Sequence, residues 1–253
     1  MRENTVKTKW RAGEITYGAW LTIPSSLPAE ALAHHGYDWI CIDMQHGAID
    51  YAAAFSMLTA ISTTPTIPFV RVPWNDFSII NRVLDAGAMG VVVPMVNSAG
   101  EARAAVSACR YAPKGARSWG PIRASIALGS DYFQHADDEI ACIVMVETKE
   151  AVERLDDILA VPGIDAVYVG PADLSITLGL PPGPDNGGAF EEARLRIATT
   201  CNARSITAGM HANASLAAKH VAAGYRMITI TQDLVAMTSA AAADLEAVGR
   251  HRA

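Results

Sequence analysis

The stretch Ala166-Val167-Tyr168-Val169-Gly170-Pro171-Ala172-Asp173-Leu174-Ser175 is the most informative guide to how this chain folds. Its first four residues form an apolar run that is typical of a buried strand. Gly170 and Pro171 then predict a turn where that strand ends, and Asp173 follows at once. An acid there can hold a cation, while the backbone N–H groups of Ala172 and Asp173 can hold an anion. The stretch therefore predicts a strand with a binding site at its carboxyl end.

Apolar runs of this kind recur along the whole chain, and the preceding one ends on a second acid, Glu147. Their continuous apolar character, with little polar alternation, is what a parallel sheet buried on both faces requires. The eight candidate strands are Gly18–Ile23, Trp39–Asp43, Phe69–Val72, Gly90–Pro94, Ile140–Val146, Ala166–Val169, Thr207–Met210 and Met227–Thr231. They predict a single (β/α)8 TIM-barrel domain over residues 1–253, with an open doubly wound sheet as the weaker alternative.

Helical patterns separate these strands, and several of them end at a glycine. The expected helices are Pro28–His35, Asp76–Ala86, Ser98–Cys109, Thr148–Leu159 and Ser215–Ala223. The stretch from Pro113 to Gln134 is expected to be a long irregular loop. A final helix over Leu234–Val248, rich in alanine and apolar on most sides, is expected to cap the barrel or to pack on another subunit.

Composition narrows the function classes. The net charge is −6 and no cluster of basic residues stands out, so we expect no nucleic-acid partner. The N-terminus has no apolar signal core and no segment is an apolar run of membrane-spanning length, so we expect a cytoplasmic protein without a membrane partner. The four cysteines lack C-x-x-C spacing and are expected to be reduced and buried: Cys41, Cys109, Cys142 and Cys201.

Polar residues gather where the predicted strands end, which is where barrel enzymes place their chemistry. In chain order these are Trp20, Asp43, His46, Arg71, Pro94, Glu147, Asp173, His211 and Asn213. The two acids without a Cys/His cluster favour a hard divalent cation, Mg²⁺ or Mn²⁺, over structural zinc. A 2-oxo acid would chelate such a cation, which would polarise the keto group as a Lewis acid.

Structural alternatives stay open for each of these residues. Glu147 could cap the following helix, although Thr148 is the better cap, and Asp173 could be an ordinary turn residue. The remaining alternatives are that Arg71 pairs with Asp43 or Asp85, that His46 is a hydrogen-bonded core histidine, and that Trp20 serves packing. We expect His34, His35, His135 and His220 to be solvated, and His211 to support the site from behind.

The distribution of lysine argues against one mechanism. A Schiff-base aldolase needs a buried lysine. The five lysines, none of which lies in a predicted strand, are Lys7, Lys9, Lys114, Lys149 and Lys219. No P-loop, dinucleotide-binding or H-E-x-x-H motif is present either, so nucleotide, NAD and zinc-protease chemistry lack support.

At these residues the chain resembles the HpcH/HpaI aldolases, which are metal-dependent class II pyruvate aldolases, in the order and spacing of six segments. The segments are Gly18–Leu21, Asp38–His46, Val70–Val72, Val93–Val96, Val146–Thr148 and Gly170–Ser175. The resemblance implies a TIM barrel whose terminal helix is exchanged between subunits, commonly in homohexamers. It also implies a divalent cofactor: Mg²⁺, Mn²⁺ or Co²⁺.

The same resemblance implies residue roles. Glu147 and Asp173 match the metal ligands, and the backbone of Ala172 and Asp173 matches the donors to the pyruvate carboxylate. The remaining matches are His46 as the general base acting through water, Asp85 as the acid that raises its basicity, Arg71 as the residue that stabilises the enolate, and Trp20 as a substrate contact.

Two positions depart from the family pattern. Met145 stands where many relatives carry Gln, and Gln45 stands where many carry Glu before the histidine. Both changes remove polar or charged groups near the site, so a preference for a dicarboxylate substrate does not carry over. Arg123 stands in a loop that also differs from the family pattern. It is either a contact to the distal part of the aldehyde substrate or an exposed arginine.

The sequence therefore predicts a class II aldolase that reversibly cleaves 4-hydroxy-2-oxo acids. The products are pyruvate, or hydroxypyruvate, and an aldehyde, formed through an enolate on the metal. Its partners are these small molecules. A CoA-ester lyase of the citrate lyase β type and a non-catalytic 2-oxo-acid binding protein are the alternatives, and the chain shows no basic cluster for CoA phosphates.

Overall fold

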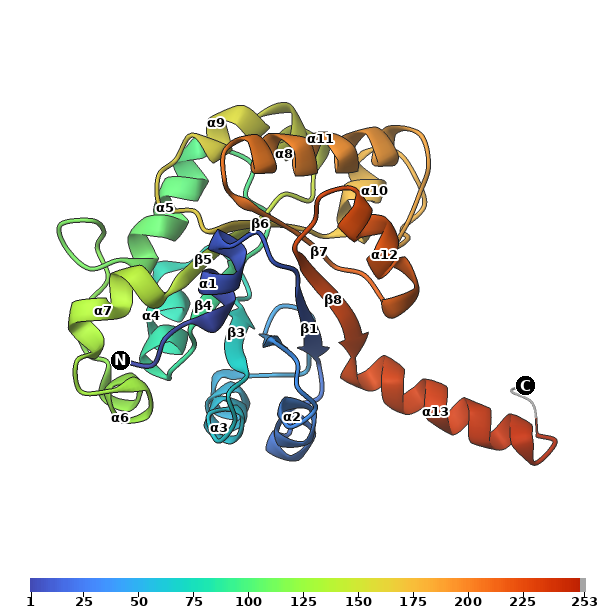
Figure 1. The fold of residues 1–253 in the computed structure, drawn as a ribbon, viewed down its shortest axis with the longest axis horizontal. Helices are drawn as coiled ribbons and strands as arrows, with labels where there is room; N and C mark the ends of the chain where they lie inside the picture. The colour runs from blue at the N-terminus through green and yellow to red at the C-terminus, as the bar shows by residue number, and fades with distance from the viewer. Residues whose placement is uncertain (251–253) are drawn as a thin grey trace.

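Eight parallel strands, paired in sequence order, close into a barrel in the computed structural model, which describes residues 1–250 (Figure 1). The strands are β1 (Thr16–Leu21), β2 (Trp39–Asp43), β3 (Ile67–Arg71), β4 (Gly90–Val93), β5 (Ala141–Met145), β6 (Ala166–Val169), β7 (Thr207–Met210) and β8 (Met227–Gln232). Pairing of β1 with β8 completes the ring. The predicted TIM barrel is confirmed, and the open-sheet alternative is wrong.

The strands are buried almost throughout, which explains their continuous apolar sequences. Trp39 and Phe69 stack at 6.0 Å between ring centroids in the barrel core. Gly18 on β1 makes room for this packing, because a Cβ there would overlap the Trp39 ring. The register between β1 and β8 also shifts after Gly18.

Helices accompany the strands, and most of them cover the outside of the barrel (Figure 1). They are α1 (Thr5–Arg11), α2 (Ser26–Ala33), α3 (Tyr51–Ile61), α4 (Phe77–Asp85), α5 (Ala99–Cys109), α6 (Ile122–Leu128), α7 (Tyr132–Glu139), α8 (Lys149–Glu153), α9 (Leu155–Leu159), α10 (Pro171–Thr177), α11 (Ala189–Ala203), α12 (Ala214–Ala222) and α13 (Asp233–Ala247). Side chains cap several of them, among which Asp76 accepts from the N–H groups of Ser78 and Ile79 at the start of α4. Gly87 follows α4 at φ 100°, a conformation that favours glycine.

Two predicted segments differ from the structure. Residues 113–134 are not one irregular loop, because α6 and the first turn of α7 lie within them. The density of glycine and proline just before Ile122 hid the start of α6. The single helix expected over Thr148–Leu159 is divided at Arg154 into α8 and α9, a break that apolar periodicity does not reveal.

The last helix, α13, does not cap the barrel, so that part of the prediction is wrong. It projects away from the body of the molecule (Figure 1). Its start is fixed by Asp233, whose carboxylate accepts from the N–H groups of Thr22 and Ile23 at 3.0–3.1 Å. Its apolar side chains are about half exposed or more: Leu234, Val235, Met237 and Leu245. This helix therefore presents an apolar surface to its surroundings.

All four cysteines are buried and unpaired, as expected. Across residues 1–250, no helix combines the length and apolar character needed to cross a bilayer.

Candidate active site

A pocket of ≈ 170 Å³ opens at the carboxyl ends of the strands. Its lining residues are His46, Arg71, Met145, Glu147, Gly170, Pro171, Ala172, Asp173 and His211. Each of these residues lies at the end of a barrel strand or in the segment after it. Residues more than a hundred positions apart in the sequence therefore meet in one pocket. The structure therefore brings together five of the predicted site residues: His46, Arg71, Glu147, Ala172 and Asp173.

Arg71, the last residue of β3, forms a two-pronged ion pair with Asp43, the last residue of β2. Its Nε donates to Asp43 Oδ1 at 2.9 Å and its Nη2 donates to Oδ2 at 2.6 Å. Burial acts to raise the pKa of Asp43, but the Arg71 guanidinium outweighs it and holds that pKa below its usual value. One of the alternatives for Arg71, a structural pair with Asp43, is therefore correct, and Arg71 lines the pocket as well.

Trp20 lies behind this pair and not in the pocket lining. It is 2% exposed, and its Nε1 donates to Asp43 Oδ2 at 3.1 Å. The Arg71 guanidinium carbon lies 5.0 Å from the centre of its ring, within cation–π range. In the described chain Trp20 supports Arg71, which agrees with the packing alternative for this residue.

Glu147 follows β5 and is buried on the pocket floor, only 2% exposed. Its Oε1 accepts from the N–H of Met95 at 2.8 Å. Gly170 leaves space for the other oxygen, because a Cβ at Gly170 would clash with Glu147 Oε2. Burial, and next the charge of Asp173, raise the pKa of Glu147 to about 7. Thr148 caps α8 through its side chain, so the alternative capping role for Glu147 is wrong.

Asp173 lies in the first turn of α10 and is partly exposed to the pocket. The first backbone bond of this helix joins Leu174 N–H to Gly170 O at 3.1 Å. Among the described residues, the N–H groups of Ala172 and Asp173 have no backbone acceptor, so they are available to an anion at the pocket mouth.

The donor set fits a hard cation. Two carboxylates, Glu147 and Asp173, share one pocket, and the pKa of Glu147 is raised mainly by burial, with the charge of Asp173 acting in the same direction. Within residues 1–250, no group of three or more His, Cys, Asp or Glu side chains is arranged to hold a metal. A cation here would accordingly take its remaining ligands from water and substrate, as Mg²⁺ commonly does.

His46 lies on the loop after β2, at the pocket edge. Its backbone N–H donates to Asp43 Oδ1 at 3.2 Å, which fixes the loop. The residue is exposed, and its imidazole has no hydrogen-bond partner among the described residues, so the alternative of a core histidine is wrong.

Asp85 does not lie with the other predicted site residues. It is the last residue of α4, a helix that leads back to the start of β4, and so it sits toward the amino end of the barrel. Its Oδ1 accepts from Arg117 Nη2 at 2.8 Å. It lines a separate surface hollow with Arg82 and Arg123. Within one chain, Asp85 and His46 therefore face opposite ends of the barrel.

In the described chain Arg123 does not reach the pocket, where it could contact the aldehyde, and its side chain is not free on the surface. It lies on α6, and its Nη2 donates to Ser62 Oγ at 3.0 Å while its Nη1 donates to Ala86 O. These acceptors terminate α3 and α4, so Arg123 fastens three helices together.

Sequence reasoning placed Asp43 at a strand end and offered it as one possible partner of Arg71, but gave it no part in the site beyond that. It also gave no role to Gln232, which ends β8 and lies 2.8 Å from His211 Nε2. The prediction that His220 is solvated is wrong, because it is fully buried against Tyr225. Leu216, one helical turn before His220 and half-buried, marks the inward face of α12 and could have indicated this.

None of the five lysines lines the pocket. Lys7 is buried, but it lies on α1 and pairs with Asp165 at 2.8 Å, where Asp165 precedes the start of β6. The only strongly buried lysine among the described residues is thus at the wrong end of the barrel for a Schiff base at the pocket.

The chain is a closed parallel TIM barrel whose carboxyl end carries a pocket lined by two carboxylates, an arginine and free amide donors. Residues 16–240 match the family HpcH/HpaI aldolase/citrate lyase, and the chain belongs to this family.

Three relatives illustrate the match. The hydroxypyruvate/pyruvate aldolase of Rhizorhabdus wittichii is 41% identical over 249 residues, covering 98% of this chain and 99% of the relative. A 4-hydroxy-2-oxo-heptane-1,7-dioate aldolase of Escherichia coli is 38% identical, covering 95% and 93%. The crystal structure of an HpcH/HpaI aldolase/citrate lyase family protein from Burkholderia cenocepacia superimposes with a TM-score of 0.91 at 35% identity, covering 97% and 99%.

Proposed function

We propose that this protein is a divalent-metal-dependent aldolase that reversibly cleaves 4-hydroxy-2-oxo acids to pyruvate or hydroxypyruvate and an aldehyde. One observation carries the proposal: Glu147, Asp173 and Arg71 converge on one pocket with His46 at its edge. The names of the two aldolase relatives, which cover nearly the whole chain, support the same class of reaction.

Glu147 and Asp173 would hold the cation. When bound, it supplies Lewis-acid polarisation of the substrate keto group. The N–H groups of Ala172 and Asp173 bind the carboxylate of the 2-oxo acid, because they are the unpaired amides at the pocket mouth. The substrate is thereby held at its carboxylate end, with its keto oxygen toward Arg71.

Arg71 stabilises the negative charge that develops on this oxygen as the C3–C4 bond breaks. Asp43 occupies Nε and one N–H of Nη2, which leaves the other N–H groups of the guanidinium for the pocket. Because the ion pair is buried and two-pronged, the guanidinium is oriented before the substrate arrives. His46, exposed and free at its imidazole, takes the proton from the C4 hydroxyl, directly or through water.

We also propose that the protein is a homo-oligomer, with a hexamer as the expected form, in which α13 packs on another copy. The exposed apolar face of α13 supports this, since such a surface on a projecting helix is unstable in water. Exposed Trp119, Ile122 and Ile126, on and before α6, add a second apolar surface on the same chain. In such an assembly Asp85 can act only on the His46 of a different copy, because the two lie at opposite ends of one barrel.

The test is a retro-aldol assay over several 4-hydroxy-2-oxo acids that follows pyruvate release, with pyruvate methyl-proton exchange in D₂O beside it. We expect both activities to require a divalent cation. A protein that binds pyruvate but shows no exchange with any metal would be a binding protein and not an aldolase.

A further inference from the structure

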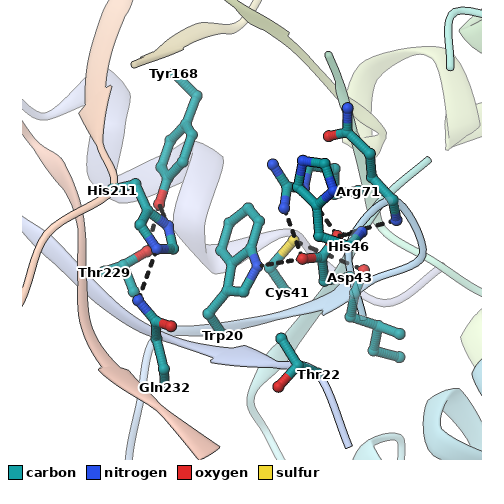
Figure 2. Close-up of polar contacts among 12 residues, drawn as sticks. Trp20, Thr22, Cys41, Asp43, His46, Arg71, Tyr168, His211, Thr229 and Gln232 are labelled. Atoms are coloured by element: carbon teal, nitrogen blue, oxygen red, sulfur yellow. Dashed lines mark hydrogen bonds and ion pairs between the residues drawn. The ribbon is translucent and has the colours of Figure 1, made fainter. Parts of the chain in front are cut away.

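His211 lies in the pocket wall, and the proposed reaction gives it no chemical step. It follows β7, and its Nδ1 lies 3.3 Å from Tyr168 Oη on β6. Its Nε2 lies 2.8 Å from the side-chain Nε2 of Gln232 at the end of β8. Both ring nitrogens are therefore occupied (Figure 2). A histidine held in this way has no free nitrogen with which to exchange a proton with the substrate.

The fixed imidazole packs edge-on against Trp20. The two ring centroids are 4.9 Å apart at an interplanar angle of 86°. Tyr168 stacks on the same indole at 5.4 Å and 12°, and its hydroxyl also bonds Thr229 Oγ1. Trp20 is consequently held by two rings whose own positions are fixed by hydrogen bonds to β8.

Trp20 in turn reaches the catalytic arginine through Asp43. Its Nε1 donates to Asp43 Oδ2 at 3.1 Å, and the same carboxylate receives both prongs of Arg71. A continuous set of contacts thus crosses the barrel mouth from Gln232 to Arg71. Figure 2 shows the residues that form it, one beside the next. Rotation of the His211 ring would loosen the indole, and a displaced indole would change how Asp43 orients the guanidinium.

Charge agrees with this arrangement. Burial, and next the nearby charge of Arg71, lower the pKa of His211 to about 4, while Asp43 acts in the opposite direction. The other ionisable neighbour, Tyr168, stays protonated because burial raises its pKa. The ring is therefore neutral at neutral pH, and Arg71 is the single cation of this network.

We propose that His211 is a positioning residue, which together with Gln232 holds Trp20 and Asp43 so that Arg71 keeps its orientation toward the substrate. This inference rests on the proposed aldolase function, since Arg71 must act on the reacting oxygen for its orientation to matter.

Two variants test the inference. His211→Phe keeps a ring edge against Trp20 but loses both hydrogen bonds, so we expect the indole N–H resonance of Trp20 to shift and kcat to fall about tenfold. That estimate lies below the ~10²-fold loss that a 1 Å misplacement can cause. KM should change little, because Arg71 acts on charge that develops during bond cleavage.

Gln232→Glu preserves shape but places a carboxylate beside His211 Nε2, which favours the imidazolium. We expect the His211 proton resonances to titrate near neutral pH, and kcat to fall on the acidic side of that titration. The wild type should show no titration of His211 above pH ~5, given its low pKa. Gln134→Glu, on the exposed face of α7, is the matched control and should keep the wild-type pH profile.

Three outcomes would overturn the inference. They are wild-type kcat in folded His211→Phe, an unmoved Trp20 resonance in that variant, and a wild-type pH profile in Gln232→Glu even though His211 titrates. If His211→Phe does not fold, the isosteric Gln232→Glu carries the test alone. Failure of the proposed function is recognised separately, since wild-type protein would then show no pyruvate proton exchange, while the resonances report the His211–Trp20 coupling without turnover.

Discussion

Arg71 and Asp43 end adjacent strands, β3 and β2, and are directly paired in the sheet register. Their side chains meet in a two-pronged ion pair at 2.6 and 2.9 Å, in which both residues are at least nine-tenths buried. Register thus places a carboxylate beside the one arginine of the pocket. The pair fixes the guanidinium before any substrate binds, which is the condition for effective electrostatic stabilisation of a developing charge.

Removing the charge of Asp43 should therefore impair catalysis more than binding. We expect Asp43→Asn to lower kcat by roughly 10- to 100-fold with a smaller change in KM, because one prong is lost and the guanidinium is freer to rotate. Arg71→Lys should retain only part of the activity, since a point charge cannot reproduce the fork. Steady-state kinetics measures both, and Asp157→Asn, at an exposed position of α9, is the control for a lost surface charge.

Metal dependence should reside in two carboxylates. Glu147→Ala or Asp173→Ala should abolish metal-dependent turnover while circular dichroism shows an intact barrel. Chelation with EDTA should silence the wild type, and Mg²⁺, Mn²⁺ or Co²⁺ should restore it. Full activity after exhaustive chelation would contradict the assignment.

His46 is expected to move protons and not to hold the metal. His46→Ala should lower kcat and pyruvate methyl-proton exchange by roughly 10²-fold or more, the usual effect of losing a general base. Metal affinity, measured by calorimetry, should change little, because the imidazole contacts neither Glu147 nor Asp173 among the described hydrogen bonds. A His46→Ala protein that loses its metal would show that the roles are reversed.

Much of this architecture could be predicted from the sequence. The eight apolar runs, most of them followed by a helix signal, predict a barrel, and the position after a run places Glu147 and Asp173 at its carboxyl end. What could not be predicted is how side chains meet across strands. The partner of Arg71 depends on register, and the contact between His211 and Gln232 depends on closure of the barrel by β8 against β1.

Asp85 shows a different limit. Sequence similarity assigns it to His46, but α4 carries it to the other end of the same barrel, where it binds Arg117. Spacing along a chain cannot distinguish a contact within one copy from a contact between copies. The role of Asp85 beside His46, which the resemblance implies, stays a prediction. It can hold only between two copies of the chain in an oligomer.

Complementation between inactive copies tests that prediction. If Asp85 supports His46 of another copy, Asp85→Asn and His46→Ala proteins should each be impaired, and mixed oligomers assembled from both should regain activity. Activity returns only if some sites contain both native residues. Mixed oligomers provide such sites only when Asp85 and His46 of one site come from different copies. The control is a mixture of Glu147→Ala with His46→Ala, whose defects lie in the same pocket of one chain and should not complement. No regain in verified mixed oligomers would remove Asp85 from the site.

Acid lability should depend on buried His220. Burial, and next the charge of Arg194, lower its pKa to about 4, and the other charged groups around it are Lys219, Asp185 and Glu191. In the unfolded chain the histidine pKa is ~6.5. Between pH 6.5 and 4 the unfolded chain therefore binds a proton that the folded chain does not. The free energy of unfolding should therefore decrease as the pH falls from about 6.5 toward 4, whereas above 6.5 this contribution is constant.

The buried imidazole also has no hydrogen-bond partner at either nitrogen among the described residues, so a proton there would have no acceptor. We expect His220→Leu to flatten the pH dependence of urea denaturation between pH 7.5 and 5, while His34→Leu, at an exposed position directly after α2, leaves it unchanged. The pKa of His211 is likewise lowered to about 4 in the folded chain, so this residue should supply the slope that remains in His220→Leu. An equal slope in His220→Leu and wild type would show that His220 is not the group whose protonation destabilises the fold, and that the packing of α12 on the barrel is insensitive to its charge.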